Sequence, residues 1–408
     1  MTRFERLVQA SLLAAALTAG SWAAAQENLV FITSASGSGD LSSWPEADGL
    51  SGLDAGDRIC QNLAGMAGLP GDYIAYLSNN EDDAVCRLHG LSGKWFGDNC
   101  GLNEPLTADD SQAWHRVDGR PIFPNAADMH FPTDRMYYPL WLDENGVQHG
   151  SFILTGSSEF GAGGGASNCE NYSNGSSNAG GSIGVSTRTS SNFGSGFGIP
   201  CQSTMRLACF RVDQQPAVAR PDHRGIRQAF MSNDRLFGAM HLNPEADGLT
   251  GRTGAYRICQ NQAAAAHLKD ADTYKALLPD AVEGPFERFD WPDGPWARLD
   301  GILVIDGADQ FVNGGSQTSL NLTPESNYVG RQSGWSGTGS DGQPDGTHCE
   351  AWTDETVTGS GSPANQAGAM WAKSATGGGF PCGGDFPLRY LFCLADSDLL
   401  FHDDFGPW

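Results

Sequence analysis

The chain has 408 residues, enough for two or three domains, and 39% of them are apolar, which excludes wholesale disorder. Its 48 acidic residues outnumber 24 Lys and Arg residues, and the formal net charge is −24. This charge argues against nucleic acid, anionic membranes and polyanions as partners, and is compatible with cations, neutral sugars and basic partners.

Residues 1–25 have the pattern of a cleaved export signal. Arg3 and Arg6 give a positive start, Leu7 to Gly20 is mostly apolar, and Ala23 to Ala25 fits a small-residue cleavage site. The alternative is a membrane anchor, but the apolar run is shorter than the roughly 20 residues that span a bilayer. We therefore expect an exported chain, located in the periplasm, on the cell surface or outside the cell, without membrane insertion.

The rest of the sequence contains an internal duplication. Pro45 to Leu50 recurs as Pro244 to Leu249, and Arg58 to Asn62 recurs at the same offset as Arg257 to Asn261. Later matches, in the same order, pair Trp114 with Trp296, Asp118 with Asp300, Tyr172 with Trp352 and Cys209 with Cys393. An ordered series of this length indicates two tandem copies of one domain.

We expect the two domains over residues 28–212 and 227–396. Residues 213–226 contain prolines and charges and are expected to form a short, stiff linker. Residues 397–408 form an acidic, aromatic tail. Features kept by both copies, such as the paired tryptophans and aspartates, are expected to have structural roles in the core or in turns and not to bind a ligand.

Short apolar runs predict a strand at both ends of each copy. These strands are expected over Leu29–Ile32 and Arg206–Val212 in the first copy, and over Ala229–Met231 and Leu388–Leu394 in the second. The segments between are rich in Gly, Ser and Asn, and the chain has 54 glycines, so long loops are expected.

One helix is predicted near the start of each copy, over Asp54–Leu69 and Gly254–Leu268. In the first, Ile59, Leu63 and Met66 fall on one apolar face, and the initial aspartate is a plausible N-cap. Strands at both ends, one helix and long loops predict an α+β fold.

All ten cysteines are expected to form disulfides, because an even number in an exported chain normally pairs. Metal or redox cysteines are the alternative, but no Cys-x-x-Cys motif occurs. The repeat gives each copy a frame of four cysteines, and the first copy has two more. We expect the pairs Cys60–Cys209, Cys169–Cys201, Cys86–Cys100, Cys259–Cys393 and Cys349–Cys382.

Each copy thus has an opening strand, a helix with the first cysteine, long loops, an inner cysteine pair and a last cysteine in the closing strand. The most specific residues are Phe31–Ser34, Ala47–Gly49, Arg58–Gln61, Val117–Gly119, Trp335–Thr338 and Cys349–Trp352. This arrangement resembles the C-type lectin-like fold, in particular its endostatin-like branch and a family of bacterial exported domains of unknown function. The resemblance covers most of both copies and implies two tandem, disulfide-stapled, loop-rich C-type lectin-like domains.

Within that resemblance, Gln343-Pro344-Asp345 is similar to the Gln-Pro-Asp tripeptide of galactose-type C-type lectins. The resemblance implies a calcium site, with oxygen ligands from Asp341, Gln343, Asp345, Glu350 and Asp354, and ligand contacts from Trp335 and Trp352. Two departures oppose it: the first copy has Gly163–Gly165 at this place, and Asp354 lies far before Cys382. The alternative is a set of Gly/Asp/Pro turns.

Catalytic patterns are weak. Gly180–Gly184 matches the nucleophile-elbow motif within a Gly/Ser-rich segment, and no His-x-x-x-His pair occurs. We therefore expect a non-enzymatic binding protein for an extracellular glycan or protein, carbohydrate-binding with Ca²⁺ assistance, and calcium is the one candidate cofactor. The alternatives are a structural or adhesive surface protein that binds proteins without metal or sugar, and an enzyme on the same fold.

Overall fold

The computed structural model describes residues 28–103, 114–123, 135–158, 161–163, 167–189, 197–214, 226–330, 332–363, 366–373, 379–384 and 388–397. The predicted export signal, most of the linker and nearly all of the tail lie outside these residues. The chain divides into two compact units, of which the second also includes Thr133–Pro139 and Thr187–Asn192 from the first repeat. We refer to them as unit 1 and unit 2.

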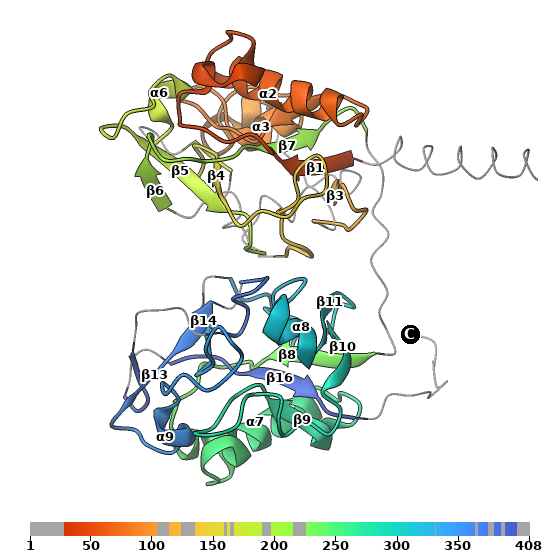
Figure 1. The fold of residues 1–408 in the computed structure, drawn as a ribbon, viewed down its shortest axis with the longest axis vertical. Coiled ribbons are helices and arrows are strands. Elements are labelled where there is room, and N and C mark those ends of the chain that lie inside the picture. The colour runs from red at the N-terminus through yellow and green to blue at the C-terminus, as the bar shows by residue number, and fades with distance from the viewer. Residues whose placement is uncertain are drawn as a thin grey trace, which may run out of the picture. The chain divides into compact units, whose positions relative to one another are not determined.

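Unit 1 is organised around a four-stranded sheet with the strand order β2-β7-β1-β3 (Figure 1). The opening strand β1 (Asn28–Ile32) pairs in parallel with β3 (Trp114–Arg116) and antiparallel with the closing strand β7 (Ala208–Arg211). Strand β7 pairs on its other side with β2 (Tyr73–Ala75). Both predicted strands of this copy are therefore confirmed, and they are neighbours in the sheet.

Unit 2 repeats this topology in the order β11-β10-β8-β16-β9. Its opening strand β8 (Arg227–Met231) lies between β10 (Asp293–Arg298) in parallel and β16 (Phe392–Ala395) in antiparallel orientation. Strand β9 (Tyr274–Ala276) corresponds to β2, and β11 (Leu303–Gly307) adds a further edge. The common topology of the two units is consistent with the duplication found in the sequence.

The closing strand of unit 2 starts later than predicted from Leu388. Arg389 and Tyr390 make isolated bridges with Leu236 and Gly334 instead of continuing the ladder with β8. The ladder with β8 therefore begins at Phe392, in the fully buried part of the segment.

The two predicted helices are confirmed as α2 (Gly52–Met66) and α7 (Gly251–Ala265), each beginning before the predicted start. Asp54 was wrongly predicted as the N-cap, because Ser51 holds that position and Asp54 lies in the first turn. A carboxylate there is still favourable to the helix dipole. Ile59 and Leu63 are buried as expected, whereas Met66 at the last turn is 71% exposed.

Shorter elements connect these parts. In unit 1 they are η1 (Leu41–Ser43), η2 (Pro45–Ala47), α3 (Ala84–Leu88), α4 (Trp95–Asp98), η3 (Asn99–Gly101), α6 (Cys169–Tyr172) and the sheet of β4 (Phe152–Leu154), β5 (Gly180–Val185) and β6 (Phe197–Pro200). In unit 2 they are η5 (Met240–Leu242), η6 (Pro244–Ala246), η7 (Ala271–Thr273), α8 (Ala308–Asn313), β12 (Ser333–Trp335), α9 (Cys349–Trp352), β13 (Thr358–Gly359), β14 (Gly361–Pro363) and β15 (Phe380–Pro381). The fold is therefore α+β, with short elements and long connections.

The tryptophan pair kept by both copies serves the core. Trp114 and Trp296 are fully buried, and each indole N–H donates to a carbonyl at the end of the closing strand, at 2.8 Å to Arg211 and 2.7 Å to Ala395. Matched burial with a matched hydrogen bond confirms the structural interpretation of this pair.

All five predicted disulfides are present. Cys60–Cys209 and Cys259–Cys393 tie the helix of each unit to its closing strand, and Cys169–Cys201 and Cys349–Cys382 are the inner bridges. Cys86–Cys100 is the extra bridge of unit 1. Among the described residues no cysteine is free.

Candidate functional site

Three of the four carboxylates predicted to bind calcium, those of Asp341, Asp345 and Asp354, are used in local turns of unit 2. The backbone N–H of Gln343 donates to Asp341 at 3.0 Å, and that of Thr347 donates to Asp345 at 2.8 Å. Asp354 accepts in the same way from the N–H of Thr356 at 2.7 Å. These are Asx-turns, the alternative that the sequence left open.

The predicted ligands include no cluster of three acidic side chains. Within the described residues, no group of three or more His, Cys, Asp or Glu side chains lies close enough together to hold a metal ion. Ca²⁺ takes six to eight oxygen ligands, whereas three of the predicted carboxylates already accept from backbone N–H groups of their own turns. Among the described residues, the predicted calcium site is therefore not supported by a cluster of acidic side chains.

The buried lysine Lys373 contacts the loop that carries the Gln343-Pro344-Asp345 motif. Lys373 is 2% exposed, and its ammonium donates to the carbonyls of Ser340 at 3.0 Å and Val312 at 3.3 Å. It also lies 5.0 Å from the ring centroid of Phe311. Burial lowers the pKa of Lys373, and the nearby charge of Asp341 opposes that shift. The loop that carries the predicted calcium motif thus has a side-chain cation hydrogen-bonded to one of its carbonyls, that of Ser340, and the same ammonium also binds helix α8.

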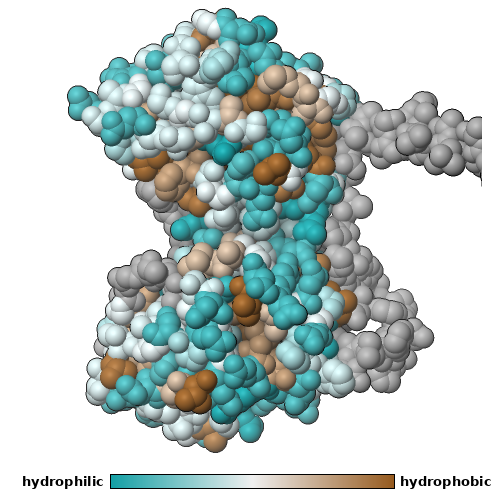
Figure 2. All heavy atoms as spheres, viewed as in Figure 1, coloured by the Kyte–Doolittle hydropathy of each residue, from teal (hydrophilic) through white to brown (hydrophobic). Residues whose placement is uncertain are grey.

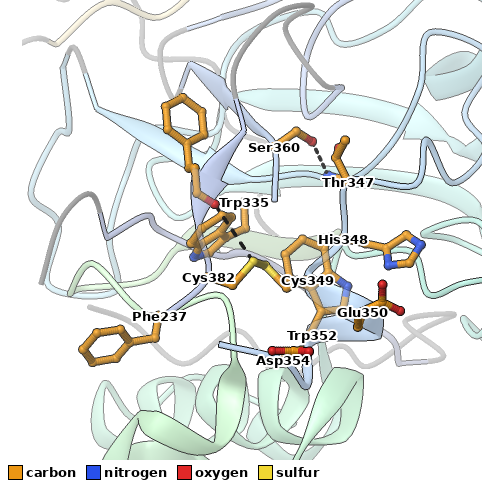
Figure 3. The surroundings of a disulfide bond; sticks show 12 residues. Phe237, Trp335, Thr347, His348, Cys349, Glu350, Trp352, Asp354, Ser360 and Cys382 are labelled. Atoms are coloured by element: carbon orange, nitrogen blue, oxygen red, sulfur yellow. Dashed lines mark hydrogen bonds between the residues drawn. A yellow bond between two sulfur atoms is a disulfide. The ribbon is translucent and has the colours of Figure 1, made fainter. Parts of the chain in front are cut away.

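Trp335 and Trp352 were predicted as ligand contacts, but both indoles are fully buried. Their N–H groups donate to the carbonyls of Leu236 at 2.9 Å and Pro279 at 2.6 Å. The two rings pack edge-on at 6.0 Å beside the inner disulfide (Figure 3). Neither ring has a face available for stacking on a sugar, so this part of the expectation is corrected to a core role.

Unit 1 contains a charged cluster that the sequence analysis missed. His149 lies 2.8 Å from Asp143 through Nε2 and 3.2 Å from Arg206 through Nδ1. The hydroxyl of Ser34 hydrogen-bonds to Glu144, not to the histidine. The cluster therefore lacks the pairing of nucleophile and base that hydrolases use.

The nucleophile-elbow motif does not form either. Gly180–Gly184 lies within β5, in the middle of the small sheet β4-β5-β6. An elbow requires a sharp turn between a strand and a helix, so the match is one of sequence only.

The inner disulfide of each unit begins an unusual turn. All four residues of α6 have positive φ, from 52° to 63°, and all four residues of α9 have φ from 47° to 67°. The left-handed conformation costs roughly 1–2 kcal/mol for each residue other than glycine. None of these eight residues is a glycine, so the surrounding contacts must compensate for considerable strain.

Three matched contacts hold the left-handed turn. A side chain caps it, since Asn168 accepts from the N–H of Asn171 at 3.0 Å and His348 accepts from that of Ala351 at 2.9 Å. The first residue is the disulfide cysteine. The fourth is a buried aromatic that donates to the loop after β2 or β9, as the Tyr172 hydroxyl does to the carbonyl of Ser78 and the Trp352 indole to that of Pro279.

Replacing Ala351 by Gly is expected to stabilise unit 2 by about 0.5–1 kcal/mol, because glycine adopts this φ of 56° without the steric cost that alanine carries. The matched control is Ala264→Gly, at an exposed position in helix α7, which should destabilise by about 0.5–1 kcal/mol. Denaturant unfolding of both variants measures the difference. Destabilisation by Ala351→Gly would contradict the left-handed assignment.

Hydrophobic residues are scattered on the visible surface and form no broad patch (Figure 2). The most exposed large ones among the described residues are Val282 at 81%, Met66 at the end of α2 at 71%, and Phe96 in the short helix α4 at 67%. Phe96 packs on Trp95 at 4.5 Å within the loop closed by Cys86–Cys100. Scattered apolar residues of this kind are normal for a protein surface.

Searches against protein-family models and against curated proteins each returned no match. Within the described residues, we find no helix with the length and hydrophobicity that a bilayer crossing requires. Five disulfides are typical of an oxidising compartment outside the cytoplasm.

Proposed function

We propose that the chain is an exported binding protein with two C-type lectin-like domains that recognises a protein partner through its loops, without calcium and without sugar. The observation that carries this proposal is the ammonium of Lys373, which lies against the loop of unit 2 where the lectin resemblance would put calcium. A loop stabilised by its own lysine needs no metal to keep its shape.

Two further observations support a binding role. Both units use the same sheet, helix and disulfide frame, so the frame is a scaffold and the connections between its strands are where the copies differ. The loops are stiffened by turns, disulfides and buried ion pairs, which reduces the entropy lost when a partner binds. A scaffold with rigid, variable loops is suited to recognition.

The proposal is tested by capture of labelled, oxidised protein on arrays of extracellular proteins and of glycans, in millimolar Ca²⁺ and in chelator. We expect binding to a protein ligand that is equal in both buffers. Binding to glycans that is lost in chelator would contradict the proposal and restore the lectin hypothesis. Absence of any captured ligand on either array would count against a binding role.

A further inference from the structure

The left-handed turns carry an identical glutamate in both units. Glu170 and Glu350 are the second residues of α6 and α9, directly after the disulfide cysteines. The third and fourth positions differ between the copies, being Asn171 and Tyr172 in one and Ala351 and Trp352 in the other. Only the cysteine and the glutamate are the same in both turns.

The structure offers no internal reason for this glutamate. Both side chains are exposed, and among the described residues neither carboxylate makes a hydrogen bond or an ion pair. Their φ angles are 54° and 47°, where glutamate is less favourable than glycine. Figure 3 shows Glu350 on the outer side of the turn, pointing away from the bridge between Cys349 and Cys382.

Another acidic pair kept by both copies behaves differently. Asp48 and Asp247 lie 3.6 Å from Arg58 and Arg257 of the neighbouring helices, so their repetition follows from local structure.

A second such pair leads to the same conclusion. Asp118 forms an ion pair with Arg116, and Asp300 forms one at 2.8 Å with Arg298. Glu170 and Glu350 differ from these partnered carboxylates. They are repeated and exposed, they lie in an unfavourable conformation, and among the described residues they have no partner. A contact outside the chain would explain why they are kept.

We infer that Glu170 and Glu350 are equivalent contact residues for a basic polypeptide, each binding a lysine or arginine side chain of the partner. This inference rests on the proposed function and names the chemistry of the partner. The carboxylate is preorganised, because the turn beneath it is fixed by the disulfide, the cap and the buried aromatic. A bidentate guanidinium–carboxylate contact is the strongest pairing open to it.

The charge of the chain fits this partner. A formal net charge of −24 attracts basic surfaces and speeds their association, while a local contact is needed to give a specific site. Two equivalent sites on one chain also raise avidity for a partner with repeated basic groups.

The test is binding of the full oxidised chain to immobilised poly-L-arginine, comparing wild type with the double variant Glu170→Gln/Glu350→Gln. The matched control is Glu81→Gln/Glu287→Gln, which removes the same charge from one exposed loop position in each unit. We expect the first variant to lose about tenfold in apparent affinity and the control less than about twofold. Thermal unfolding of both variants should match the wild type, since glutamine keeps the size of glutamate.

Equal losses in the two double variants would overturn the inference, because the effect would then be one of net charge only. Failure of the wild type to bind poly-L-arginine would also overturn it. Neither result touches the proposed function, which is judged separately by calcium-independent capture of a protein ligand on the arrays.

Discussion

Replacing Cys60 and Cys209 together by alanine is expected to lower the free energy of unfolding of unit 1 by about 5 kcal/mol at 25 °C. The bridge joins residues 149 apart in the sequence, and in the chain-entropy model a cross-link of that length restricts the unfolded chain most strongly. It also fixes helix α2 to the central part of the sheet. Urea denaturation, followed by hydrogen exchange of peptides from unit 1, measures the loss.

The matched control is Cys86→Ala/Cys100→Ala in the same unit. That bridge spans only 14 residues and is expected to contribute about 3 kcal/mol in the same model. All four cysteines are buried, so the cavities left by the removed sulfur atoms are similar. A loss for the short bridge that equals or exceeds the loss for the long one would contradict an entropic origin of the stabilisation.

The framework of the fold could be predicted from the sequence because two copies constrain each other. Cys60 and Cys259 recur in the same helix motif, and Cys209 and Cys393 in the same closing pattern, so each pairing had to work twice. The opening and closing strands were visible as short apolar runs. Such signals are local, and the repeat supplied the long-range pairing that local signals lack.

The candidate site was less predictable, because the same residue types serve turns and metal sites. Asp341 and Asp345 offer the oxygens that calcium prefers, but their carboxylates accept from backbone N–H groups two residues further on. Nothing in the local sequence distinguishes these uses. The decisive residue, Lys373, lies well after the motif and reaches it only through the fold.

The left-handed turn was hidden for a different reason. Cysteine, glutamate, alanine and tryptophan do not favour positive φ, so propensity gave no indication of a run of four such residues at Cys349–Trp352. Their conformation is imposed by the disulfide, the cap and the buried indole. Strain of this kind is set by tertiary contacts, so the sequence alone did not reveal it.

The second large effect is expected at Arg252. Its side chain is 2% exposed, and the guanidinium donates to the carbonyls of Leu278 and Gly284, both at 3.3 Å, and to the carboxylate of Asp280 at 2.7 Å. In unit 1 the matching carbonyl, that of Leu77, accepts from Arg87 at 3.2 Å. The charge is thus needed at this place in both units, although it comes from helix α7 in one and from α3 in the other.

The position of the partner carboxylate differs between the two units in the same way as the position of the arginine. Arg87 on the short helix α3 pairs with Asp57 on helix α2 at 2.6 Å, whereas Arg252 on helix α7 pairs with Asp280 on the loop after β9. The arginine and the carboxylate have exchanged places between the helix and the segment after the strand. Both the ion pair and the hydrogen bond to the carbonyl of Leu77 or Leu278 are thereby kept. This compensation indicates that the guanidinium is needed to hold the loop against the helix.

Arg252→Met is therefore expected to destabilise unit 2 by about 3 kcal/mol, because it leaves two buried carbonyls without their donor and removes the buried arginine that pairs with Asp280. The loss is limited by Arg288, which also contacts Asp280, at 3.0 Å. The control is Arg257→Met on the same helix, whose side chain is 45% exposed and lies 3.6 Å from Asp247, and which should cost no more than about 1 kcal/mol. Denaturant unfolding with hydrogen exchange of unit 2 compares them, and equal losses would show that burial of the guanidinium adds nothing to its contribution.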